Sequence, residues 1–452
     1  MIRRAGALLA ATVLLALAAC GSADDPGSAP LPGYTLDLPD LEPLDTPAGP
    51  TQVLSGVLGS AGYLVEVPPE WNGDLVVWTH GYLGNSDALV VDAPYYGLRQ
   101  RFVEQGYAWA ASSYDRNGYD VASGVRSTRE LADAFAGLAG TPTAPTRTYL
   151  AGISMGGHVA ARSVEEYPDR YAGALPLCGA LGDVAIFDYF LGVQLVTEAL
   201  AGVRYYPPGP AFADTVLPRL HAALGLTPGD PAVTSPAAQQ LRAAVVLGSG
   251  GARPGTDAAF GFWKDVLLEL GVREPAGPVG GVAADPEVVA TNVGADVQPG
   301  TPVDLNAAVR RVAPADPATR ASTALTAVAP IAGRPAVPVL SLHALGDLYA
   351  PFSMEQVYAT EVAASGRSAD LVQRAIRNAG HCEFSDAEAG AAWDDLVTWV
   401  TDGLRPDGDD VLDAAAVADP AYGCRFSDPE AYRIAPEPSE ADTRRLFDPC
   451  PT

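Results

Sequence analysis

A serine set between glycines constrains this chain more than any other feature. Residues 152–156 read GISMG, with Ser154 at the centre. An apolar run, residues 148–151, precedes the serine, and a segment of helical period, residues 158–166, follows it. A chain that passes from strand to helix this quickly turns so sharply that the serine is strained and its neighbours must be small. Gly152 and Gly156 meet that need, so the pattern predicts an exposed serine on a tight turn.

A glycine–serine loop could match this pattern by chance, because the chain holds 47 glycines. The flanking strand and helix favour the tight turn. The composition, 48% hydrophobic and 18% charged, is that of a folded protein. A chain of 452 residues can bury a large core without help from disulfides. The formal net charge of −26 argues against nucleic acid or an anionic membrane surface as a partner, since both would repel the chain.

The N-terminus predicts an extracytoplasmic protein. Arg3 and Arg4 precede an apolar run, residues 8–16, which is too short to span a bilayer as a permanent helix. The run continues into LAAC, residues 17–20, and resembles a bacterial lipoprotein signal peptide with its lipobox. The resemblance implies lipidation of Cys20, a membrane contact through that lipid only, and a flexible tether over residues 21–50. A plain signal peptide on a secreted protein is the alternative.

Four cysteines remain after Cys20, and an even number outside the cytoplasm suggests two disulfides. Three pairings are possible. We favour Cys178 with Cys382, because both are expected near Ser154 in the folded chain, and Cys424 with Cys450 in the C-terminal tail.

Short apolar strands alternate with helical segments from about residue 51, the pattern of an α/β fold with a mostly parallel sheet. Residues 51–180 and 335–404 are expected to form this core, with helices on both faces of the sheet. The alternation stops between them, so residues 181–334 are interpreted as an inserted cap or lid. Residues 405–452, acidic and proline-rich, are expected to be a tail held by its disulfide. The expected elements of the core are strands at 63–67, 74–79, 108–113, 148–151, 172–178, 337–343 and 370–375, and helices at 96–105, 127–138, 158–166, 353–364 and 386–400.

A serine hydroxyl is a weak nucleophile, so it needs a base to take its proton and a third group to orient that base. The residues that could supply these parts resemble those of the α/β-hydrolase superfamily, specifically secreted bacterial serine esterases. The resemblance covers about residues 75–400 without the cap. It rests on the sequence HGY at residues 80–82, the GISMG turn, Asp347 and His381.

The resemblance implies the chain order serine, acid, histidine. Of the five histidines only His381 follows the proposed acid, Asp347, which lies in a turn after a strand. Asp183 or Asp188 is the fallback acid, from the end of the preceding core strand. The backbone N–H groups of Tyr82 and Met155 are expected to form the oxyanion hole, although HGY at a strand end could also be a simple turn.

The sequence His381-Cys382 is also similar to tannases and feruloyl esterases, in which a disulfide joins the residue after the catalytic histidine to a cysteine just before the nucleophile. Here Ile153 occupies that upstream position, so the tannase pairing cannot form. The resemblance implies hydrolysis of a small or aromatic carboxylic ester through an acyl-enzyme, with no metal or organic cofactor. Two alternatives stay open: a membrane-anchored serine peptidase of the same fold, and a non-catalytic lipoprotein that keeps the fold.

Overall fold

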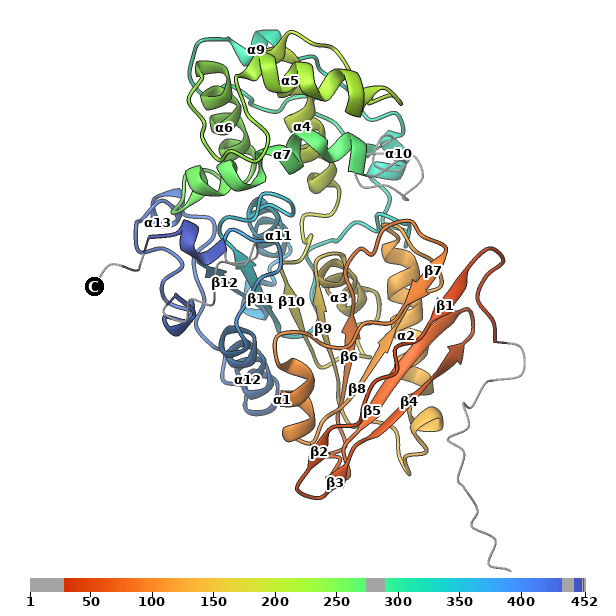
Figure 1. The fold of residues 1–452 in the computed structure, drawn as a ribbon. Helices are drawn as coiled ribbons and strands as arrows, with labels where there is room; N and C mark the ends of the chain where they lie inside the picture. The colour runs from red at the N-terminus through yellow and green to blue at the C-terminus, as the bar shows by residue number, and fades with distance from the viewer. Residues whose placement is uncertain (1–27, 274–288, 433–442, 449, 451–452) are drawn as a thin grey trace, which may run out of the picture.

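A twisted eight-stranded sheet forms the centre of the computed structural model, which describes residues 28–273, 289–432, 443–448 and 450 (Figure 1). The strand order is β12-β11-β10-β9-β6-β8-β5-β4. All neighbours are parallel except β5, which runs antiparallel to both β4 and β8. The strands are β4 (Gln52–Leu58), β5 (Ala61–Val67), β6 (Leu75–Thr79), β8 (Ala108–Ser112), β9 (Thr148–Ile153), β10 (Gly173–Leu177), β11 (Val339–Ala344) and β12 (Leu371–Ile376).

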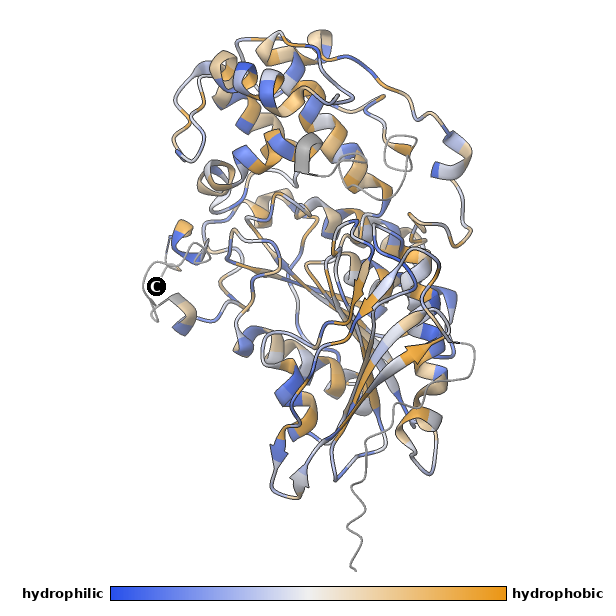
Figure 2. Ribbon diagram, turned by 45° about the vertical axis from the view of Figure 1, so that its right-hand side comes forward, coloured by the Kyte–Doolittle hydropathy of each residue, from blue (hydrophilic) through white to orange (hydrophobic). Residues whose placement is uncertain are grey.

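Alternating side chains bury both faces of this sheet under helices. Val76 and Trp78 of β6 share one hydrophobic cluster with residues of α1 (Leu98–Glu104) and α12 (Asp386–Asp402). Leu75 and Val77 point to the other face, as the period of two requires. There they pack with α2 (Val121–Ala139), α3 (Met155–Glu166) and α11 (Ser353–Ala364). Many residues of the central strands are hydrophobic, and the covering helices carry both kinds of residue (Figure 2). This confirms the expected α/β architecture with helices on both faces.

The segment between β10 and β11 forms a helical layer of its own, drawn above the sheet in Figure 1. α4 is long and apolar enough to cross a membrane, yet most of it is buried inside this layer. It packs with the following helices in a single cluster of buried side chains. The layer consists of α4 (Val184–Ala201), η1 (Phe212–Val216), α5 (Leu217–Leu224), α6 (Pro236–Gly248), α7 (Thr256–Arg273), α9 (Leu305–Ala308) and α10 (Pro317–Arg320).

Part of the expected N-terminal tether packs on the core. β1 (Thr35–Asp37) pairs in parallel with β7 (Ala88–Val90), and a small hairpin joins β2 (Asp45–Thr46) to β3 (Gly49–Pro50). Leu38, Leu41 and Leu44 contact the hydrophobic cluster under α1 and α12, which explains why this stretch is held. The ordered chain therefore begins before residue 51. The predicted signal peptide, Cys20 and residues 21–27 lie outside the described residues.

The C-terminal tail lies along the edge strand β12. The backbone N–H of Asp409 donates to the Gln373 carbonyl at 2.8 Å, and the tail continues through α13 (Ala414–Val417). A disulfide joins Cys424 to Cys450, one of the two pairs favoured above. Three short 3-10 turns complete the described elements: η2 (Ser368–Asp370), η3 (Glu430–Tyr432) and η4 (Thr443–Leu446).

Candidate active site

Ser154 occupies the sharp turn between β9 and α3. Its backbone angles, φ 53° and ψ −122°, are ones that a non-glycine residue rarely adopts. A side chain at either flanking glycine would overlap β6: at Gly152 it would meet the Thr79 hydroxyl, and at Gly156 the Thr79 carbonyl. The glycines are thus required by the close approach of β6, and the strained turn presents the Ser154 side chain at the end of the sheet.

Three side chains from distant parts of the chain meet at this turn. The Ser154 hydroxyl lies 2.8 Å from Nε2 of His381, and Nδ1 of His381 lies 2.6 Å from Oδ2 of Asp347. The His381 side chain is 17% exposed and Asp347 is fully buried. The structure therefore brings together the serine, the histidine and the acid that the sequence analysis singled out, hydrogen-bonded in the order expected of a nucleophile, a base and an orienting acid.

The loop after β11 fixes the orientation of Asp347. Its Oδ1 accepts hydrogen bonds from the backbone N–H groups of Tyr349 at 2.8 Å and Ala350 at 3.1 Å, which leaves Oδ2 for His381. Gly346 passes so close to Ala379 that a Cβ there would lie 2.7 Å from the Ala379 Cα atom. The acid loop and the histidine loop are thus packed directly on each other.

The fallback acids have other partners. Asp183 accepts hydrogen bonds from the backbone N–H groups of Val184, at the start of α4, and of Ile331. Asp188 forms an ion pair with Arg320 and accepts a hydrogen bond from the Thr291 N–H at 2.7 Å. Both carboxylates therefore stabilise the helical layer between β10 and β11, called the inserted layer below. Asp347 instead contacts the His381 imidazole.

The expected oxyanion donors lie beside the serine. A Cβ on Gly81 would lie 3.2 Å from the Ser154 Cβ, so the loop that carries Tyr82 passes next to the nucleophile position. Met155 is the first residue of α3, where a backbone N–H has no acceptor within the helix. His80, at the start of this loop, is buried and stacks on Tyr114 with ring centroids 3.9 Å apart, in keeping with a structural part.

A disulfide holds the histidine loop against the end of β10. It joins Cys178 to Cys382, with Cα atoms 5.2 Å apart, and Cys382 directly follows His381. In the sheet register, Leu177 of β10 is level with Ile153 of β9, so Cys178 is level with Ser154. The bridge thus reaches the neighbouring strand at the same height as Ser154 itself. Both sulfurs are used by the bridge, so this cluster with His381 offers no thiolate to a metal ion.

The fold can now be named from the strand order and from this turn. Seven of the eight strands run in one direction, and the serine turn, the acid and the histidine follow the ends of β9, β11 and β12. The chain has the α/β-hydrolase fold. In this fold the nucleophile sits on a strand-to-helix turn and is followed along the chain by the acid and then the histidine.

Comparisons with known proteins found similarity to proteins named as an amidase and as esterases. No family model matches the chain. The chain is 24% identical to o-phthalyl amidase from Xanthobacter agilis over 449 residues, which cover 85% of this chain and 95% of the amidase. Among solved structures it is similar to feruloyl esterase B from Aspergillus oryzae, at 17% identity and a TM-score of 0.43, covering 79% of this chain and 82% of that one. An esterase from Aspergillus oryzae gives 14% identity and a TM-score of 0.44 over 79% and 81% of the two chains.

Aromatic side chains of the inserted layer reach the active end of this α/β-hydrolase. The Tyr349 ring meets the His381 ring edge-on, with centroids 5.3 Å apart, and stacks on Trp263 of α7 at 6.1 Å. Phe190 of α4 lies 5.7 Å from Tyr349 on a second side. Trp263 also donates its indole N–H to the Ala379 carbonyl at 2.6 Å, two residues before His381. The sequence analysis did not identify these residues, because nothing in the local sequence links α7 to a loop more than a hundred residues later.

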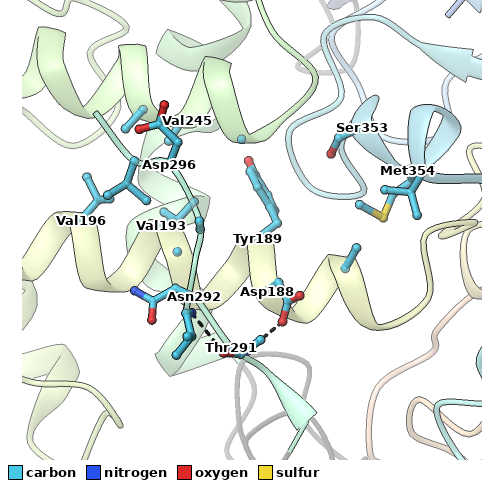
Figure 3. Close-up of a pocket in the computed structure, with 18 of the residues that line it drawn as sticks. Asp188, Tyr189, Val193, Val196, Val245, Thr291, Asn292, Asp296, Ser353 and Met354 are labelled. Atoms are coloured by element: carbon cyan, nitrogen blue, oxygen red, sulfur yellow. Dashed lines mark hydrogen bonds between the residues drawn. The ribbon is translucent and has the colours of Figure 1, made fainter. Parts of the chain in front are cut away.

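A cavity of about 370 Å³ lies beside α4 (Figure 3). Tyr189, Val193 and Val196 of α4 line it, whereas Phe187 and Phe190 project roughly opposite, as the helical period of 3.6 requires. Phe187 contacts Tyr119 and Phe190 contacts Tyr349. The lining of the cavity includes none of Ser154, Asp347 and His381.

We expect the Cys178–Cys382 bridge to support activity as well as stability. Replacing both cysteines with serine should lower the free energy of unfolding by about 2–5 kcal/mol, and should lower kcat because Cys382 restrains the loop next to His381. A matched variant, with Cys424 and Cys450 both changed to serine, should lose stability but keep kcat. Denaturant unfolding and ester turnover of both variants test this. Equal kcat in the two double variants would show that the first bridge has no part in placing His381.

Proposed function

We propose that this protein is a serine hydrolase that cleaves carboxylic esters through an acyl-enzyme. The observation that carries the proposal is the hydrogen-bonded series from Ser154 through His381 to Asp347. Composition, fold and the strained turn are compatible with other functions, but a buried carboxylate aligned on an imidazole that faces a serine hydroxyl is the arrangement that activates a nucleophile.

In this proposal His381 takes the proton of the Ser154 hydroxyl as the oxygen adds to the substrate carbonyl, and then returns that proton to the leaving alcohol. Asp347, whose Oδ1 accepts two backbone hydrogen bonds, stabilises the imidazolium that forms through its Oδ2. Water then attacks the acyl-enzyme by the same route. The backbone N–H groups of Met155 and Tyr82 stabilise the negative charge on the carbonyl oxygen, and one such donor contributes roughly 3–4 kcal/mol to lowering the barrier.

The aromatic residues from the inserted layer support an aromatic or other apolar acyl group as substrate. Tyr349, in the loop after β11, lies edge-on to His381 and packs on Trp263 and Phe190 of the inserted layer, and this aromatic wall would gain from burying a substrate ring. Inserted residues 181–334 would then act as the cap that shields the acyl-enzyme from bulk water. The two disulfides agree with an extracytoplasmic location. We propose in addition that Cys20 carries a lipid that anchors the protein.

Amide hydrolysis is a second candidate, favoured by the match to o-phthalyl amidase over nearly its whole length. The same three side chains serve both reactions, because both pass through a tetrahedral intermediate and an acyl-enzyme. The two differ in the leaving group that His381 must protonate. The aromatic wall beside His381 and the phthalyl group in the amidase's name both favour a substrate with an aromatic acyl group.

A substrate panel tests the proposal. Purified protein is given the p-nitrophenyl esters of acetate, butyrate and benzoate, and the p-nitroanilide of benzoate. Ester turnover that is lost on treatment with phenylmethylsulfonyl fluoride is the expected result, with faster acylation by benzoate if the aromatic wall receives the acyl group. Faster turnover of the anilide than of the matched ester would favour the amidase alternative. An absence of turnover on the whole panel, and on phthalyl amides, would favour the non-catalytic alternative.

A further inference from the structure

A second buried histidine lies behind the proposed acid. His343 is on β11, is fully buried, and has its Nε2 3.8 Å from Oδ2 of Asp347, the same oxygen that faces His381. This Nε2 lies 2.8 Å from the Ala350 carbonyl oxygen, and Nδ1 lies 3.2 Å from Oε1 of Glu355 on α11. His343 thus touches the acid loop on one side and a buried carboxylate on the other.

The partners of His343 indicate that both of its ring nitrogens carry protons. The Ala350 carbonyl can only accept a hydrogen bond, so Nε2 must donate. Glu355 also behaves as an acceptor: its Oε2 accepts from the Ser341 hydroxyl at 2.6 Å and from the Gln373 amide at 2.5 Å. A carboxylate held in this way leaves Oε1 free to accept from Nδ1, and an imidazole that donates from both nitrogens is a cation.

Electrostatics point the same way. Burial by itself lowers the pKa of His343, but the hydrogen bond and charge of Glu355, the charge of Asp347 and the Ala350 carbonyl outweigh it, so that the pKa is raised above the ordinary histidine value. A positive charge inside the protein is tolerated where it is paired and hydrogen-bonded, as this one is.

We propose that His343 is a positioning residue: together with Glu355 it places a buried positive charge beside Asp347, which keeps this acid ionised and aligned on His381. The inference rests on the proposed function, because it assumes that Asp347 is the catalytic acid. In this arrangement a charged pair from β11 and α11 orients the acid, and the acid in turn orients His381.

Other ionisable groups around this pair do not replace its charge. Arg253 of the inserted layer is buried and donates to the Leu345 carbonyl at 2.6 Å. Burial lowers the pKa of Arg253 to about 10, so it stays positive at neutral pH. Tyr189 and Tyr422 have pKa values raised by burial and stay neutral. Arg253 donates to two backbone carbonyls and to the Ser249 hydroxyl, so it does not take the place of His343, and removing His343 takes away the imidazole with which Glu355 is paired.

Loss of this charge should change the pH dependence of catalysis in a defined direction. Two positive charges close together repel each other, so a neutral glutamine in place of His343 should remove a repulsion that the imidazolium of the catalytic base otherwise meets. The acid limb of kcat/KM, which reports the base of the free enzyme, should then move to higher pH by roughly 0.5–1 unit. We expect kcat to fall about tenfold or more with KM nearly unchanged, because positioning of the acid affects the transition state. If His343 served packing alone, its replacement would lower the free energy of unfolding and leave the acid limb of kcat/KM at its wild-type pH.

His158→Gln is the matched control. His158 is also fully buried with both nitrogens bonded, to the Tyr119 hydroxyl at 2.9 Å and the Ala329 carbonyl at 3.0 Å. Burial lowers its pKa to about 4, so His158 is neutral and its replacement removes a ring but no charge. The acid limb of His158→Gln should stay where it is in the wild type.

The decisive readout does not depend on activity. The chain has five histidines, so nitrogen-15 NMR of ring-labelled full-length protein can resolve each ring, with His343→Gln identifying the signal of interest. At about pH 7.5, one unit above the ordinary histidine pKa, His343 should show two protonated nitrogens.

If His343→Gln does not fold, Glu355→Gln identifies the signal instead, since loss of the carboxylate shifts that ring alone. A neutral His343 ring, or an acid limb that is the same in His343→Gln and wild type, would overturn the inference. An inactive wild type with a cationic His343 would instead refute the proposed function alone.

Discussion

Replacing Ser154 with alanine should lower kcat on an aryl ester by about 10⁶-fold and leave the fold intact. In the proposed mechanism the hydroxyl oxygen forms the acyl-enzyme, so its removal should leave the site without a nucleophile. Alanine fits the turn as well as serine does, because the strain at φ 53° belongs to the backbone. Initial-rate measurements on purified wild type and variant, with matched circular dichroism spectra and melting temperatures, give the comparison.

Ser163→Ala provides the control on the same helix. Ser163 is buried on α3, and its hydroxyl has no hydrogen-bond partner among the described residues, so its loss should leave kcat within a fewfold range of the wild-type value. Wild-type activity in Ser154→Ala protein of verified mass would refute the assignment of the nucleophile.

Asp347→Asn should lower kcat by about 10⁴-fold. The amide keeps the size of the side chain, but it can present its NH₂ group to Nδ1 of His381, which favours the imidazole tautomer with the proton on Nε2. That tautomer cannot accept the Ser154 proton. The loss should be concentrated in kcat, because Asp347 is buried behind His381 and is not expected to contact the substrate.

Asp188→Asn is the companion variant, since Asp188 was the alternative acid and is paired with Arg320. We expect its kcat to stay within about tenfold of the wild-type value, with a lower melting temperature as the main effect. The opposite ranking, a severe loss in Asp188→Asn and near-normal turnover in Asp347→Asn, would mean that the acid has been misassigned.

The elements expected from the sequence agree closely with the core of the structure, because the signals are local there. The helix expected at residues 353–364 is α11 with the same bounds, and the apolar runs before Ser154 and His343 are β9 and β11. β4 was not predicted. It reads QVLSGVL, an edge strand with a polar start and a central glycine, so neither its alternation nor its propensity is distinctive.

The position of Asp347 in a turn after a strand made it the preferred acid, and the chain order serine, acid, histidine then selected His381, because it is the one histidine that follows Asp347. Such reasoning does not predict contacts between distant segments of the chain. Trp263 reaches Tyr349 only because α7 folds back over the histidine loop, and His343 reaches Asp347 only because the loop after β11 turns back on its own strand. The disulfide of Cys178 with Cys382 was favoured because both residues were placed at one end of the sheet, and that is where the structure joins them.

The claim on which the function depends is that the Ser154 oxygen is activated as a nucleophile. Labelling of the wild-type protein with a fluorophosphonate probe, followed by mass mapping of the modified peptide, tests this most directly. We predict one adduct per chain, on Ser154, with labelling strongly slowed in Asp347→Asn. A probe that leaves the folded wild type unlabelled, or that modifies a residue other than Ser154, would contradict the account.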